Sequence, residues 1–117
     1  MKYYKKLLLD KLSRSGWELT TQEDGADWWL EEVWSLTSIA TNWGYELYVS
    51  FLVDPQYDGI IKSRAVWAVS ATDEVPHSRA NYNEISVAQM HLSKGKFDEQ
   101  LSQFVDLVNN HRNLASL

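Results

Sequence analysis

The sequence predicts an α+β fold, a two-layer sandwich with an N-terminal and a C-terminal helix packed on one face of a four-stranded antiparallel sheet. Both ends of the 117-residue chain carry apolar residues every three or four positions, which is helical periodicity. Four segments between them are rich in β-branched and aromatic residues or alternate apolar with polar ones, as strands do. Strands flanked by helices favour an antiparallel meander, and the length favours one domain over residues 1–117.

The first segment, residues 2–13, is expected to be helical because Tyr4, Leu8 and Leu12 fall on one stripe. Gly16 follows as a helix stop. Residues 17–22 read as a short extended piece at most, and the sequence EDGAD reads as a turn.

The stretch GADWWLEEVWSL, residues 25–36, places three tryptophans within seven positions. We expect an irregular entry over residues 26–30 and a strand over residues 32–40, with Trp34 in the sheet and Glu32 misplaced on its apolar side. Neighbours in extended chain point to opposite sides, and in a helix they lie about 100° apart. Trp28 and Trp29 should therefore be unequally buried, one at the core margin and one exposed. The alternative, that all three tryptophans belong to the core, stays open.

Three further strands are expected over residues 45–53, 64–71 and 84–92, and a long loop over residues 72–83. The final helix is expected over residues 96–112. Its apolar residues follow helical spacing, its carboxylates lie early and Arg112 lies late, which matches the helix dipole.

The two faces of the predicted sheet differ from an ordinary solvated sheet. If Phe51, Trp67 and Val87 face the helices, the outer face carries Tyr48, Ser50, Leu52, Val66, Ala68, Ser70, Ser86, Ala88 and Met90. A solvated face would carry more charge, so we expect a second copy of the chain or a ligand to cover it. The predicted partner-binding residues are Trp28, Trp29, Tyr48, Leu52, Ala68 and Met90.

Charge and composition exclude several classes of function. The net charge is −5, with +4 in residues 1–14 and −9 in residues 15–61, which contain no lysine or arginine. An acidic chain repels phosphate backbones, so nucleic acid is not an expected partner. The absence of cysteine excludes a disulfide scaffold and thiolate chemistry. The apolar run at residues 7–9 is too short for a signal peptide or a membrane span. We therefore expect a cytoplasmic protein without a membrane partner.

No constellation of catalytic residues is recognisable. His77, His91 and His111 have no sequence-local partner, and the common zinc, phosphate-loop and serine-hydrolase motifs are absent. We therefore expect no enzymatic activity, no cofactor and no metal-ligand set.

Long loops are biased toward function, and the 72–83 loop concentrates polar side chains. Alternation of turns in a meander places it at the same end of the sheet as Trp43. The candidate ligand-binding residues are Trp43, Asp73, Glu74, His77, Arg79 and Tyr82.

Two functions follow from these features. The first is a non-enzymatic protein-interaction or adaptor domain that binds a protein partner or itself, as a homodimer joined through the outer sheet face. The alternative is a small-molecule or metal-binding domain that uses the 72–83 end of the sheet. Whether the charge asymmetry acts within one chain or between chains is open at this point.

Overall fold

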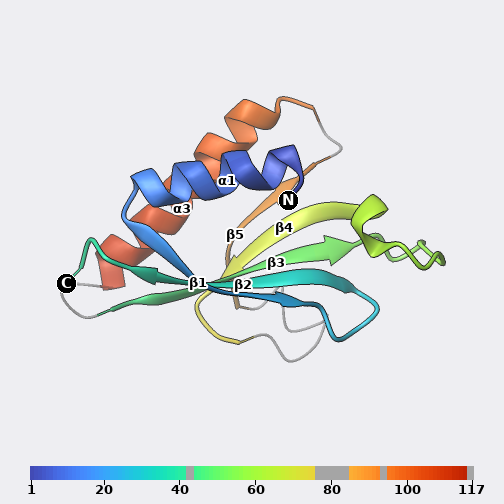
Figure 1. The fold of residues 1–117 in the computed structure, drawn as a ribbon. Coiled ribbons are helices and arrows are strands. Elements are labelled where there is room, and N and C mark those ends of the chain that lie inside the picture. The colour runs from blue at the N-terminus through green and yellow to red at the C-terminus, as the bar shows by residue number, and fades with distance from the viewer. Residues whose placement is uncertain (42–43, 76–84, 93–94, 116–117) are drawn as a thin grey trace.

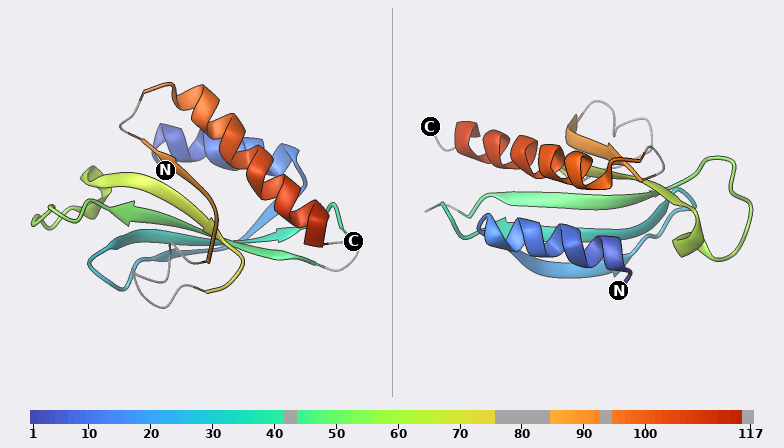
Figure 2. Two further views of the ribbon diagram at one scale, coloured as in Figure 1. Left: turned by 180° about the vertical axis from the view of Figure 1, so that it is seen from behind. Right: turned by 90° about the horizontal axis from the view of Figure 1, so that it is seen from above.

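The computed structural model describes residues 1–41, 44–75, 85–92 and 95–115. Over these residues the sheet has five antiparallel strands in the order β1-β2-β3-β4-β5. Both helices lie on the same face of the sheet (Figures 1 and 2), which confirms the two-layer α+β layout. The elements are α1 (Tyr3–Arg14), β1 (Trp17–Asp24), β2 (Leu30–Ser38), β3 (Glu46–Val53), η1 (Lys62–Arg64), β4 (Val66–Thr72), β5 (Ser86–His91) and α3 (Phe97–Ala115).

The expected number of strands was one too low, because residues 17–24 form a full edge strand. In β1 only Trp17 is buried, and most of the later residues are exposed. The strand therefore has no alternating apolar pattern, and its pairing with β2 gives it its structure. A register shift between Leu19 and Thr21 interrupts that pairing, and the Thr20 hydroxyl donates to the Ser35 carbonyl at 2.9 Å.

Gly16 ends α1, as the sequence predicts. Its φ is +88°, and a Cβ at this position would lie 2.6 Å from the Cβ of Ala40. Both the backbone conformation and the space therefore favour glycine. This tight turn takes the chain from α1 directly into β1.

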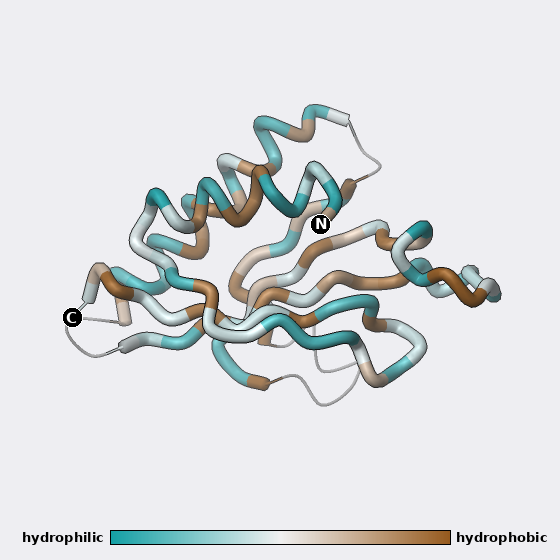
Figure 3. The backbone as a smooth tube through the Cα atoms, viewed as in Figure 1, coloured by the Kyte–Doolittle hydropathy of each residue, from teal (hydrophilic) through white to brown (hydrophobic). Residues whose placement is uncertain are grey.

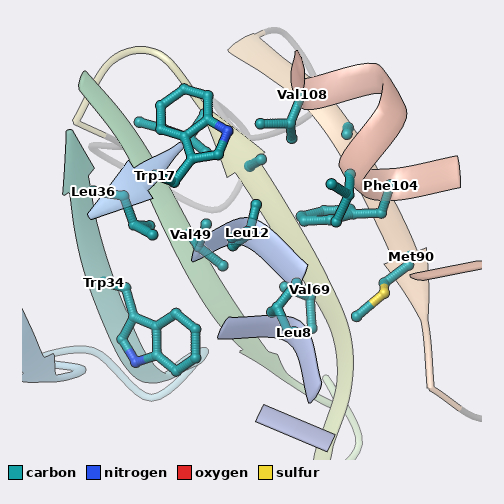
Figure 4. Packing of buried hydrophobic residues seen from close by; sticks show 14 of the residues in the cluster. Leu8, Leu12, Trp17, Trp34, Leu36, Val49, Val69, Met90, Phe104 and Val108 are labelled. Atoms are coloured by element: carbon teal, nitrogen blue, oxygen red, sulfur yellow. The ribbon is translucent and has the colours of Figure 1, made fainter. Parts of the chain in front are cut away.

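The core lies between the helices and the sheet. Trp34 and Phe51 are fully buried, and their rings meet edge to face with centroids 4.8 Å apart. The helices supply Leu8 and Leu12 from α1 and Phe104 from α3 (Figure 4). Hydrophobic and hydrophilic residues are intermixed along both helices and the strands (Figure 3), and the buried ones belong to this core. The helical periodicity in the sequence therefore identified the correct helix faces.

The predicted face of β5 is correct for Ser86 but wrong for Ala88 and Met90. Ala71 pairs with Ala88 and Thr72 pairs with Ser86, which leaves Val87 between two consecutive pairs. An extra residue of this kind is a β-bulge, and it reverses the alternation of the side chains that follow. Ala88 and Met90 consequently point into the core beside α3, as Figure 4 shows for Met90.

A second bulge changes the start of β4. Val53 pairs with Val66 and Leu52 pairs with Ala68, so Trp67 is the extra residue. Val66 packs against the core, whereas the ring of Trp67 lies 5.1 Å from that of His91. The expected assignment of Val66 to the outer face is therefore wrong as well.

Candidate functional site

The tryptophan pair that opens β2 is unequally buried, as predicted. Trp29 is 6% exposed and packs with Leu30. Val33 and Leu52 pack against this pair. Trp28 is 57% exposed. Trp29 therefore contributes to folding, and of the two tryptophans only Trp28 is available for contact with another molecule.

The centre of the outer sheet face is already covered within one chain. Ala68 pairs with Leu52 on this face but is only 1% exposed, and Ser50, Ser70 and Thr72 are also buried. Tyr48 and Leu52 are half-buried, and the Tyr48 hydroxyl donates to Glu46 at 3.0 Å. Met90, also predicted as a partner contact, is a core residue on the opposite face. The predicted partner-binding set is thus divided between the two faces.

A group of exposed apolar side chains lies instead at one end of the molecule, which we call the loop end: Trp28, Ile60 and Ile61. Ile60 is 98% exposed and Ile61 is 44% exposed. Ile60 and Ile61 belong to the loop between β3 and β4, which projects beyond the sheet (Figure 1). Trp28 belongs to the turn between β1 and β2.

Lys62 ties these two loops together. Its ammonium donates to the carbonyl oxygens of Asp27 at 2.6 Å, Leu30 at 3.1 Å and Gly25 at 3.3 Å. The amide of Val53 also donates to the Trp29 carbonyl at 2.9 Å. The loop end is therefore a surface built from two loops held against each other.

The structure describes only part of the predicted ligand-binding site. Trp43, His77, Arg79 and Tyr82 lie outside the described residues, whereas Asp73 and Glu74 lie within them. Asp73 contacts His111 of α3 at 3.1 Å, and both side chains are over a third exposed. The sequence analysis found no sequence-local partner for His111, and its separation of 38 residues from Asp73 hid this contact.

Tyr45 belongs to the same region. Its ring lies 6.0 Å from the rings of Trp17 and His111. Burial, followed by the charge of Asp73, raises the pKa of Tyr45 to about 12. The Tyr45 hydroxyl is therefore kept protonated, and the arrangement links α3 to the end of β4.

A second cluster, which the sequence interpretation missed, joins α1 to β2. The Lys5 side chain is only 6% exposed, and its Nζ atom contacts Glu31 at 2.5 Å and Glu32 at 3.0 Å. Glu32 also accepts a hydrogen bond from the Trp34 indole at 2.7 Å. The Lys5 ammonium lies 4.2 Å from the centre of the Phe51 ring. Glu32, which looked misplaced on the apolar side of its strand, is thus the acceptor for a buried lysine and a buried tryptophan.

One signal in the sequence could have found this cluster. Lys5 falls on the same helical stripe as Leu8 and Leu12, so its charge had to be paired inside the fold. The pairing also shows that part of the charge asymmetry acts within one chain, because the basic N-terminal helix neutralises the acidic segment here.

A cavity of about 430 Å³ opens beside this cluster. It lies between the start of α1, the ends of β1 and β2 that adjoin their turn, and η1. Its lining residues are Met1, Lys2, Lys5, Gln22, Glu31, Glu32 and Ser63. A cavity of this size is within the range of small-molecule sites.

Comparison with known proteins gives no relative from which a function could be transferred. No family of known proteins matches the sequence, and neither a curated protein nor a solved structure is similar enough to match it. Over the described residues, no group of three or more metal-ligating side chains comes together, and neither helix is long and apolar enough to cross a membrane.

Proposed function

We propose that this chain is a non-enzymatic protein-interaction domain and that the loop end is its contact surface. The observation that carries the proposal is the exposure of Trp28, Ile60 and Ile61 on loops that Lys62 holds in place. Exposed tryptophan is a common anchor of protein interfaces, since it buries a large area and keeps one hydrogen-bond donor. A fixed surface also loses little conformational entropy on binding.

The interface is therefore expected at the loop end and not on the outer sheet face. Ala68 at the centre of the outer face is buried and Met90 points into the core, so neither side chain is available to a partner. The loop end offers apolar area without any rearrangement of the fold.

Self-association is the form of the proposal that can be tested with this chain alone. Asp27 is next to Trp28, and Asp58 is two residues before Ile60. Two loop ends that meet would bring these carboxylates together. Salt screens such repulsion, so self-association through the loop end should strengthen as the salt concentration rises.

The test is sedimentation velocity of the wild type between about 5 μM and about 500 μM, at about 0.05 M and about 0.5 M salt. We expect a concentration-dependent dimer that is favoured at high salt and is lost in Trp28→Ala/Ile60→Ser. The matched control is Ile39→Ser, because Ile39 is an exposed isoleucine that follows the opposite end of β2. A wild type that stays monomeric at both salt concentrations, or equal loss in the control, would contradict the proposal.

A further inference from the structure

The cavity beside Lys5 has walls of opposite charge. On the β2 wall, Glu31 and Glu32 share one ammonium, that of Lys5, which leaves an excess of one negative charge. Glu31 Oε1 accepts from Lys5, and Glu32 Oε1 accepts from Lys5 and from the Trp34 indole. Among the described residues, nothing donates to either Oε2 atom, so both oxygens can accept further hydrogen bonds.

Tyr4 adds an unsatisfied group next to these carboxylates. Its hydroxyl oxygen is buried and has no hydrogen-bond partner among the described residues. Burial, followed by the charges of Glu31 and Glu32, raises the pKa of Tyr4, so the hydroxyl is neutral. A buried polar group without a partner costs about 1–3 kcal/mol. Tyr4 does not line the cavity, so this hydroxyl is a buried neighbour of the two carboxylates and not a contact for a ligand.

The other wall carries a positive charge. Lys2, at the start of α1, donates to the Ser63 carbonyl of η1 at 2.5 Å. Lys2 is exposed, and its contact there is a neutral carbonyl, so its charge is not neutralised by a carboxylate in any described ion pair. The Gln22 amide of β1 also lines the cavity and can donate or accept.

These charges select among the classes of small ligand. A simple cation would be attracted by Glu31 and Glu32 but repelled by Lys2 and Lys5. A simple anion would be attracted by Lys2 and Lys5 but repelled by the two carboxylates. A molecule with both an ammonium and a carboxylate meets a partner of opposite charge on each wall and adds no net charge to the cavity.

We propose that this cavity binds a small zwitterion of the α-amino-acid class. Its ammonium would lie against the free oxygens of Glu31 and Glu32, and its carboxylate would lie against Lys2. The Gln22 amide would provide a further polar contact. The cavity volume leaves room for a small side chain beyond the two charged groups. None of Trp28, Ile60 and Ile61 lines this cavity, although both sites adjoin η1, and neither proposal depends on the other.

The test uses glycine, L-alanine and L-serine as probes and follows the NMR signal of the Trp34 indole N–H, which donates to Glu32. We expect a saturable shift with a Kd of about 1–10 mM, because few contacts are available to so small a ligand. Acetate and methylammonium each carry one of the two charges. They should bind at least about tenfold more weakly, a difference of about 1.4 kcal/mol or more.

Two variants test the two walls separately. Lys2→Ala and Glu31→Gln should each weaken glycine binding at least about tenfold. Glu31→Gln leaves Glu32 to pair with Lys5. Lys2→Ala changes an exposed side chain, so it gives a result even if Glu31→Gln folds poorly. The controls are Lys6→Ala on α1 and Glu18→Gln on β1, which are exposed and do not line the cavity.

Three results would overturn the zwitterion site. The first is no saturable shift from any amino acid up to about 50 mM. The second is binding of methylammonium or acetate as tight as that of glycine. The third is equal affinity in Lys2→Ala, Glu31→Gln and the wild type. None of these results bears on sedimentation of the Trp28→Ala/Ile60→Ser variant, so failure of this site is distinguishable from failure of the loop-end proposal.

Discussion

The tryptophan pair shows how neighbouring residues of one type acquire different roles. Trp29 packs with Leu30 and is nearly buried, whereas Trp28 extends into solvent. The cause is geometric, because consecutive side chains near the start of a strand cannot point the same way. The sequence predicts the inequality, and only the structure shows which tryptophan is inside.

Truncation of the two tryptophans should therefore have different effects on stability. Trp29→Ala is expected to lower the free energy of unfolding by about 3–5 kcal/mol, the usual cost of removing a large core aromatic. Trp28→Ala should lower it by less than about 1 kcal/mol, as expected for a surface side chain. Urea denaturation followed by circular dichroism measures both. Equal losses would mean that Trp28 is also structural, which would remove the anchor from the loop end.

At the scale of elements, the loop end depends on a contact between two loops that are distant in the sequence. Lys62 of η1 donates to two carbonyls in the turn between β1 and β2 and to the carbonyl of Leu30, the first residue of β2. A lysine ammonium has three donors, so all three are used. The β3–β4 loop is thereby fastened to the neighbouring turn although it projects beyond the sheet.

Lys62→Met should loosen this contact while keeping most of the aliphatic side chain. We expect a loss of about 1–3 kcal/mol, since hydrogen bonds from a charged donor are lost. Amide hydrogen exchange should become faster in residues 25–30 and 54–64. Arg64→Met is the control, because Arg64 is an exposed cation in the same short helix. Faster exchange in both variants alike would show that the effect belongs to η1 in general and not to the Lys62 contacts.

At the scale of the whole molecule, two tyrosines connect the helix layer with the sheet. Tyr4 of α1 lies against Phe51, with ring centroids 6.2 Å apart, and Tyr45 lies against Trp17 and His111. Burial is the main reason that the pKa of each hydroxyl is raised in the folded protein. The free energy of unfolding should therefore decrease at alkaline pH.

The sign of the linkage follows from the raised pKa values. Above the ordinary tyrosine pKa of about 10, the unfolded chain releases protons that the folded chain retains, so unfolding becomes more favourable. The contribution of Tyr45 to the free energy of unfolding should be fully present below about pH 10. It should fall as the pH rises toward the pKa of Tyr45, which is about 12. Tyr45→Phe should make the fall shallower, measured by urea denaturation between about pH 8 and about pH 11.5. The exposed Tyr3 provides the control variant, Tyr3→Phe. An unchanged slope in Tyr45→Phe would contradict the role of Tyr45.

Local pattern determined most of the architecture. The stripes around Leu8, Leu12 and Phe104 identified both helices and their buried faces, and the alternation around Phe51 identified a central strand. Gly16 correctly marked the end of the first helix. These features are local because helix and strand periods are written into consecutive residues.

Tertiary structure decided what depends on pairing between distant segments. The edge strand β1 exists through its pairing with β2, since its exposed residues carry no apolar alternation. A bulge at Val87 turned Met90 into the core, and no local pattern announces such an insertion. The loop end and the cavity beside Lys5 each join segments more than 20 residues apart. The sequence alone therefore determined which residues could be buried, and the pairing of the strands decided which residues remained available for function.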